Sequence, residues 1–146
     1  MRREIRIGRE PFDLATEVDR LSAGAAAIVT FTGCVRAEDG LTALTLEHYP
    51  GMTEREIESH VAEAERRWPL LGVTIIHRVG TLNPGEPIVL VAVAADHRRE
   101  AFEACEFLMD YLKTKAPFWK QETKGDEADW VEAKASDDAA AERWRK

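Results

Sequence analysis

Apolar residues recur at steps of three and four in several stretches of the chain, a spacing that places them on one face of an α-helix. The longest stretch begins at Asp96, a suitable N-cap, and should end just before Pro117. The same spacing predicts further helices over residues 13–21, 53–68 and 137–145. The second of these should start with a capping box at Thr53, followed three residues later by a glutamate.

Strands are predicted where β-branched and aromatic residues run together or alternate with polar ones. These segments are 25–35, 44–49, 73–79, 88–95, 118–123 and 130–133. A Pro84-Gly85 turn joins the third and fourth, which should form a hairpin, and the polar stretch 37–40 should be a loop. Strands and helices mix without a regular βαβ order, so the sequence predicts an α+β sandwich. No repeat or linker is visible, and we expect one domain over 1–146.

Composition and charge narrow the possible partners. The chain has 146 residues and a net charge of −7, which disfavours broad contact with nucleic acid. Its longest apolar run, Ile88–Ala95, has eight residues, where a membrane-spanning helix needs about 20. No apolar signal segment follows the first charged residues, so we expect a cytoplasmic protein with Cys34 and Cys105 as reduced thiols.

A small basic region stands out in this acidic chain. Three lysines and no acidic residue lie between Tyr111 and Lys120, whereas 121–146 carries eight acidic and five basic residues. Lys113 should end a helix and Lys120 should lie on the strand after the turn, so the two ammonium groups should converge. Converging cations attract an anion and favour loss of a proton from one of them. The alternative is that Lys113 only complements the helix dipole.

Three other cations are candidates for the same anion. His97 and Arg98 lie in the first helical turn beside unpaired backbone N–H groups, where cations are tolerated best if an anion is bound. The alternative is solvated surface charge. Arg36 follows a buried strand and is the third candidate.

A thiol enzyme and a metal site have less support. Cys34 could act as a nucleophile with a histidine as base, but a cysteine in an apolar strand usually serves packing. The four histidines show no metal-ligand spacing, so no metal is expected. Trp119, next to Lys120, could pack on a flat ring or close the core.

Short motifs occur in one order over nearly the whole chain. They are Phe31–Arg36 (FTGCVR), Leu46–Met52 (LEHYPGM), His77–Gly80 (HRVG), Pro84–Glu86 (PGE), His97–Phe102 (HRREAF) and Tyr111–Glu122 (YLKTKAPFWKQE). Together they resemble the large, catalytic subunit of molybdopterin synthase. The resemblance implies an α/β hammerhead fold. It also implies a sulfurtransferase that inserts two sulfurs into cyclic pyranopterin monophosphate, producing the dithiolene of molybdopterin.

The same resemblance implies partners and an assembly. The sulfur would arrive as the C-terminal thiocarboxylate of a small ubiquitin-like subunit, whose Gly-Gly tail would enter a pocket of this chain. Two large subunits would form a central homodimer with one small subunit at each end, a heterotetramer. No cofactor is implied, because the sulfur donor is consumed as a substrate.

Roles follow residue by residue from the motifs. The resemblance implies that Arg36, His97 and Arg98 hold the substrate phosphate, the last two either in the same protomer or across the dimer. Lys113 would be the acid–base or covalent group and Lys120 the orienting cation, or the reverse. The remaining implied contacts are Cys34 and Val35 through their backbone, and Gln121 and Glu122. The alternative function is a non-catalytic module that binds a phosphorylated metabolite or a partner's C-terminus.

Overall fold

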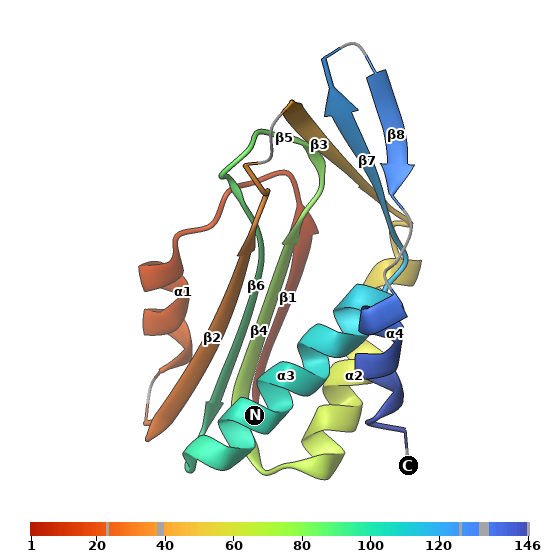
Figure 1. The fold of residues 1–146 in the computed structure, drawn as a ribbon. Coiled ribbons are helices and arrows are strands. Elements are labelled where there is room, and N and C mark those ends of the chain that lie inside the picture. The colour runs from red at the N-terminus through yellow and green to blue at the C-terminus, as the bar shows by residue number, and fades with distance from the viewer. Residues whose placement is uncertain (23, 38–39, 126, 132–134, 146) are drawn as a thin grey trace.

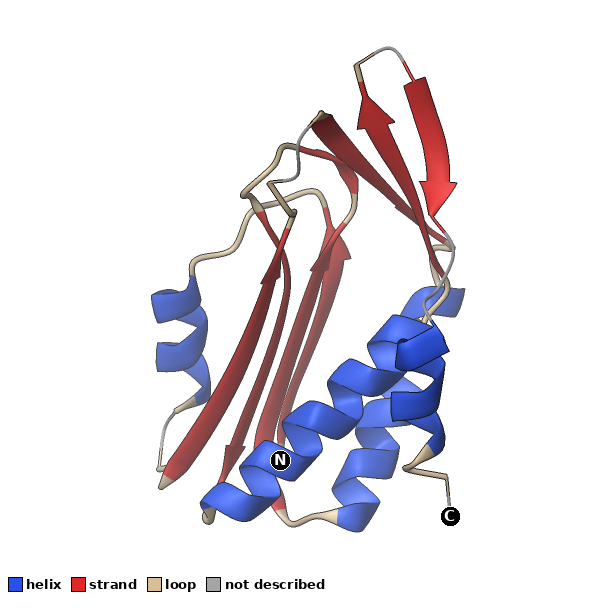
Figure 2. Ribbon diagram, in the orientation of Figure 1, coloured by secondary structure: helices blue, strands red, loops and turns tan. Residues whose placement is uncertain are grey.

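The computed structural model of the protein describes residues 1–22, 24–37, 40–125, 127–131 and 135–145. Within these residues the chain forms two four-stranded sheets and four helices (Figures 1 and 2). The first sheet has the strand order β1-β4-β6-β2 and the second has the order β5-β3-β7-β8. The strands are β1 (Arg2–Gly8), β2 (Ala27–Cys34), β3 (Leu41–His48), β4 (Leu70–Arg78), β5 (Gly80–Leu82), β6 (Pro87–Ala95), β7 (Phe118–Lys124) and β8 (Glu127–Val131). The helices are α1 (Leu14–Leu21), α2 (Met52–Arg67), α3 (Arg98–Thr114) and α4 (Ala135–Glu142).

The first sheet contains the predicted hairpin and one strand that was not predicted. β4 and β6 pair antiparallel, as expected. The connection between them contains the short strand β5, which pairs with β3 in the second sheet. β1 pairs parallel to β4 at the edge of the first sheet. Its charged residues outnumber its two isoleucines, Ile5 and Ile7, so its apolar pattern is too short to be recognised.

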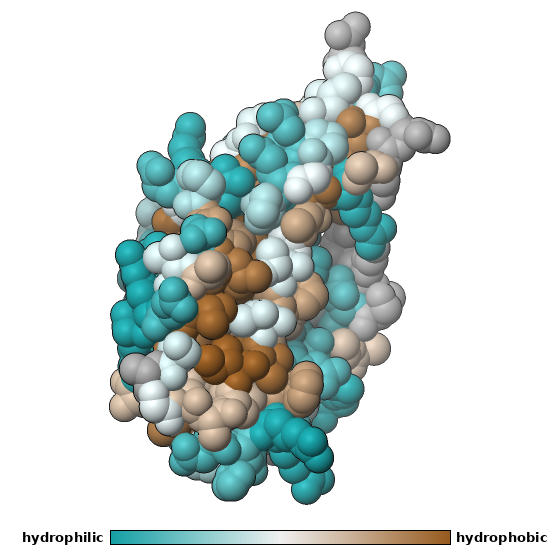
Figure 3. All heavy atoms as spheres, turned by 90° about the vertical axis from the view of Figure 1, so that its left-hand side faces the viewer, coloured by the Kyte–Doolittle hydropathy of each residue, from teal (hydrophilic) through white to brown (hydrophobic). Residues whose placement is uncertain are grey.

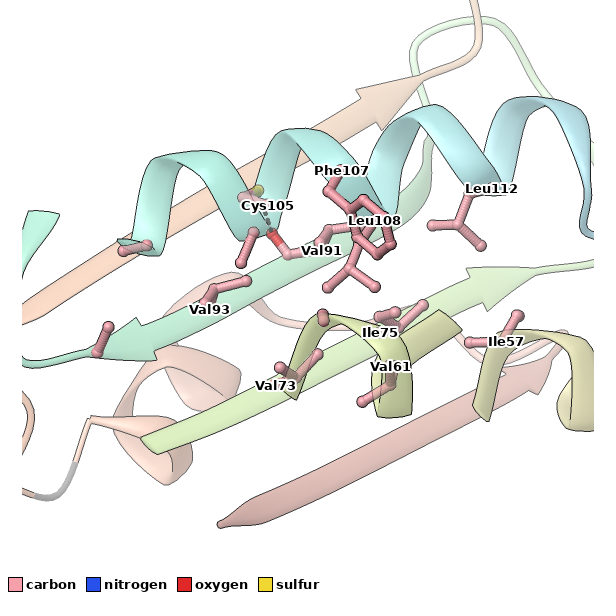
Figure 4. Close-up of a cluster of buried hydrophobic side chains, with 14 of the residues drawn as sticks. Ile57, Val61, Val73, Ile75, Val91, Val93, Cys105, Phe107, Leu108 and Leu112 are labelled. Carbon is pink, nitrogen blue, oxygen red and sulfur yellow. Dashed lines mark hydrogen bonds between the residues drawn. The ribbon is translucent and has the colours of Figure 1, made fainter. Parts of the chain in front are cut away.

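Helices cover both faces of the first sheet. α1 lies on one face, α2 and α3 lie on the other, and α4 packs on the outside of α3 (Figure 1). The main core fills the space between α2, α3 and the sheet (Figure 4). Within it the Cys105 thiol lies 3.7 Å from the carbonyl oxygen of Val91, and burial raises the pKa of this thiol to about 12. Cys105 is therefore a packing residue, and both cysteines are free, as predicted.

Two helices begin at residues other than the predicted caps. The N-cap of α2 is Gly51, whose φ of 86° favours glycine and whose N–H donates to Glu54 Oε1 at 2.9 Å. Thr53 lies inside the first turn, so the predicted capping box at Thr53 is wrong. The N-cap of α3 is His97, because Asp96 still lies in the bend after β6.

The second sheet extends away from one end of the first, beyond the end of α3 (Figure 1). A separate apolar cluster joins the two sheets, and its buried members are Val35, Leu41, Leu44, Leu46 and Leu82. The predicted strand 130–133 is described only to Val131, and residues 38–39 of the predicted loop lie outside the described residues. The α+β class predicted from the sequence is confirmed.

Candidate functional site

The turn between α3 and β7 brings Lys113 and Lys120 to the same end of the molecule. α3 ends when the N–H of Lys115 donates to the carbonyl of Tyr111 at 2.7 Å. Pro117 then stops helical hydrogen bonding and β7 starts at Phe118. The chain doubles back within this turn, so the two lysines lie on either side of it, as the sequence predicts.

The charges of both lysines act on the pKa of one buried histidine. His77, near the end of β4, is 7% exposed. Burial is the main reason that its pKa falls to about 4, and the positive charges of Lys120 and Lys113 lower it further, with a smaller effect from His48. Its hydrogen bond with the Arg78 carbonyl acts in the opposite direction. Both lysines therefore lie within electrostatic range of one imidazole, although they come from different elements.

The register of the second sheet places Gln121 and Glu122, the two residues after Lys120, on opposite faces of the sheet. Lys120 pairs with Leu46 of β3, and Glu122 pairs with Leu44, so both lie on the face that carries the apolar cluster. Gln121 alternates to the opposite face, where its β8 neighbour is Trp130. Of the two polar residues expected near Lys120, only Glu122 shares its face of the sheet.

The segment from Cys34 to Arg36 lies close to the same cluster. A register shift at Cys34 ends the pairing of β2 with β6. The Val35 N–H then donates to the Glu86 carbonyl at 2.9 Å, and the Val35 carbonyl accepts from Gly85 at 2.8 Å. The Val35 side chain is buried in the cluster with Leu46, the neighbour of Lys120, whereas Cys34 and Arg36 are exposed. The turn of the β5–β6 connection therefore fixes the strand end that carries Arg36.

His97 and Arg98 lie at the other end of α3. Arg98 and Lys113 are fifteen positions apart, which corresponds to about 22 Å along the helix axis. Both residues are exposed, and the His97 side chain makes no capping hydrogen bond in the part of the chain that the structure describes. Within one protomer, Lys113 therefore lies at the end of α3 that leads to Lys120, whereas His97 and Arg98 lie at the opposite end.

Two hollows on the described part of the surface lie apart from the two lysines. One hollow, of about 510 Å³, lies between α3 and α4 and is lined in part by Tyr111 and Lys115 of α3. The other lies between Arg67, Trp68 and Trp144. Lys113 and Lys120 line neither of them. The candidate site is defined instead by the lysine charges that act on His77 and by the strand register of the second sheet. Among the described residues no group of three or more His, Cys, Asp or Glu side chains is arranged to hold a metal ion, and no helix is long and apolar enough to cross a membrane.

Acid should destabilise the fold through His77. An unfolded histidine takes up its proton near pH 6.5, whereas folded His77 does so only near pH 4. Stability from this residue is therefore complete above pH 6.5 and is lost as the pH falls toward 4, by about 3 kcal/mol in total. His60, whose pKa is also lowered, mainly by burial, acts in the same direction. Urea unfolding at pH 7 and pH 4.5 should show a smaller loss in His77→Phe than in the wild type. Equal losses would contradict the buried neutral state of His77.

The sequence matches the MoaE protein family over residues 7–115, a range that includes Lys113 but stops before Lys120. The molybdopterin synthase catalytic subunit of Mesorhizobium japonicum is 56% identical over 147 residues, covering 97% of this chain and 92% of that protein. The catalytic subunit of Escherichia coli is 52% identical, with 97% of both chains covered. The solved structure of the molybdopterin biosynthesis MoaE protein from Burkholderia ambifaria has 53% identity and a TM-score of 0.85, covering 99% of this chain and 98% of that one.

These matches define an enzyme subunit of molybdenum cofactor biosynthesis. The chain belongs to the MoaE protein family, whose relatives named above are molybdopterin synthase catalytic subunits. The resemblance found in the sequence is confirmed, and with it the prediction of a sulfurtransferase that acts as the catalytic subunit of molybdopterin synthase. Sequence reasoning missed the contact between His77 and Phe118, although His77 begins one of the family motifs.

Proposed function

We propose that Lys113 and Lys120 are the catalytic residues with which this chain moves sulfur from a thiocarboxylate to cyclic pyranopterin monophosphate. The observation that carries the proposal is the turn between α3 and β7, which places the two lysines on either side of it, and the charges of both act on the buried His77. A thiocarboxylate and a cyclic phosphate are both anions, so attack of sulfur on the precursor brings negative charges together. Convergent ammonium groups offset that repulsion and are able to transfer the protons that ring opening requires.

The sulfur donor is the thiocarboxylated C-terminus of a small ubiquitin-like subunit. An extended tail fits this arrangement, because the lysines lie at a turn between two elements. Exposed Lys113 and half-buried Lys120 leave room for such a tail beside the turn. Glu122, on the same sheet face, and the Cys34–Val35 strand end complete the contacts that we assign to substrate. We also assign Gln121 to the site, although its side chain lies on the opposite face of β7.

The phosphate-binding cations come from two copies of the chain. We assign Arg36 to the site formed by the lysines of its own protomer. His97 and Arg98, in contrast, are about 22 Å from Lys113 along α3. We therefore assign His97 and Arg98 to the site of the neighbouring protomer. The site is complete only in a homodimer, the core of a heterotetramer with two small subunits.

The side of the molecule that carries α1 and β2 fits a dimer contact. β2 is an edge strand of the first sheet, and Phe31 on it is 40% exposed. Hydrophobic side chains gather on this side of the molecule (Figure 3). β2 begins beside the end of β6, since Ala27 pairs with Ala95, so His97 and Arg98 lie close to the same edge. A second copy placed along β2 would meet both cations. We propose further that residues 1–146 form one domain and that the protein acts in the cytoplasm.

Reconstitution tests this function. The purified chain, a thiocarboxylated small subunit and cyclic pyranopterin monophosphate are mixed, and dithiolene formation is measured. We expect turnover that consumes two thiocarboxylates for each dithiolene. Binding of the precursor without any turnover would favour the alternative of a non-catalytic anion-binding module and contradict the proposal.

A further inference from the structure

We propose that His77 is a positioning residue that sets the place of Lys120 by stacking on Phe118. The inference rests on the proposed function, because it assigns Lys120 to the reaction. The imidazole of His77 lies 3.8 Å from the Phe118 ring, centroid to centroid, with only 16° between the ring planes. His77 belongs to β4 of the first sheet and Phe118 to β7 of the second, so this contact joins the two sheets.

The stack lies directly beside Lys120. Side chains two residues apart on a strand lie on the same face, so Phe118 and Lys120 are neighbours on the face that meets the first sheet. His48 of β3 pairs with Phe118 across the strands, with ring centroids 6.4 Å apart. A shift of the Phe118 ring would therefore move the start of β7, and Lys120 with it.

The His77 ring is itself fixed. Its Nδ1 lies 2.9 Å from the carbonyl oxygen of Arg78, and because a carbonyl only accepts, Nδ1 carries the proton. The ring is then neutral, with Nε2 unprotonated. The charged and titratable groups that act on it are Lys113 from α3, Lys120 from β7 and His48 from β3, and burial keeps it from charging. A flat, neutral ring stacked on Phe118 supports β7 without adding a further positive charge.

A second contact holds the other side of the turn. The buried Thr53 hydroxyl of α2 donates to the Pro117 carbonyl at 3.2 Å and accepts from the N–H of Tyr49 at 3.1 Å. The turn between the two lysines is thus held by α2 at Pro117 and by β4 at Phe118. The distance between the lysines depends on these two contacts.

Three variants separate positioning from simple loss of stability. His77→Ala removes the stack, His77→Phe keeps a flat neutral ring, and Val73→Ala makes a cavity in the same strand about 13 Å from His77. We expect kcat of dithiolene formation to fall at least about 10-fold in His77→Ala, with KM for the small subunit within about twofold of the wild type. His77→Phe should restore kcat to within about threefold, and Val73→Ala should lower thermal stability without changing kcat of the folded protein.

Amide hydrogen exchange gives a readout that does not depend on catalysis. Exchange over β7 should be at least about 10-fold faster in His77→Ala and unchanged in His77→Phe and Val73→Ala. If His77→Ala does not fold, a second variant is available. Phe118→Leu removes the same stack by changing its other member, which is half-buried, and should give the same loss of kcat. Equal kcat in His77→Ala and wild type, equal impairment of His77→Phe and His77→Ala, or unchanged exchange over β7 would each overturn the proposal. A wild-type chain without turnover would refute the proposed function, and the exchange rates would still decide the positioning role.

Discussion

Replacing Lys113 by alanine is expected to lower kcat of dithiolene formation by about 100-fold or more, while the chain stays folded. Lys113 is exposed in the last turn of α3, so its loss should change the free energy of unfolding by no more than about 0.5 kcal/mol. We expect a large effect on the reaction because the proposed function places its charge where the two anionic reactants meet. The measurement is single-turnover kinetics with the thiocarboxylated small subunit, with a thermal melt of the same preparation.

Lys115 provides the matched control for this variant. It has the same charge, is exposed, and lies two residues further along, at the C-cap of α3. Its charge acts on His60 of α2, whereas that of Lys113 acts on His77. Lys115→Ala should therefore retain activity within about twofold. Full activity in Lys113→Ala, or equal losses in the two variants, would remove Lys113 from the mechanism.

Replacing Arg98 by alanine is expected to lower kcat/KM for the pterin precursor by about 10- to 100-fold, the cost of one charged hydrogen bond to phosphate. The effect is notable because Arg98 lies about 22 Å from Lys113 within one protomer. Binding of the small subunit should be unchanged, because Arg98 is assigned to the phosphate. The measurement is the dependence of initial rate on precursor concentration.

Arg99 is the control for Arg98. It is the next residue of α3, is exposed, and its guanidinium pairs with Glu103 at 3.1 Å. Arg99→Ala should leave kcat/KM within about twofold, since an exposed pair of this kind contributes little. A loss in Arg99→Ala as large as that in Arg98→Ala would indicate a general effect of charge at this end of the helix.

Strong periodicity allowed the sequence to predict most of the fold. The apolar spacing of α1 and the long apolar stripe of α3 are local features, and both helices were found with nearly correct bounds. β1 and β5 were missed for opposite reasons: β1 is mostly charged, and β5 has three residues. The start of α2 was misplaced because Gly51 makes the cap with its positive φ, which the Thr53 pattern concealed.

The site was predictable where it is local and hidden where it depends on sheet pairing. Lys113 and Lys120 flank a proline turn, so their positions on either side of it followed from the sequence. The stack of His77 on Phe118 joins residues 41 positions apart and depends on how two sheets meet. The opposite faces of Gln121 and Glu122 follow from strand alternation once β7 is placed. The separation of Arg98 from Lys113 was already contained in the length of α3.

Activity of mixed dimers tests the shared site most directly. Copies carrying Lys113→Ala and copies carrying Arg98→Ala are co-expressed with different tags, and the dimers that contain one of each are purified. If each site combines Lys113 of one copy with Arg98 of the other, one of the two sites is intact, and the mixed dimer should show about half of the wild-type activity. Activity no higher than that of the two parent dimers would contradict a site built from two copies.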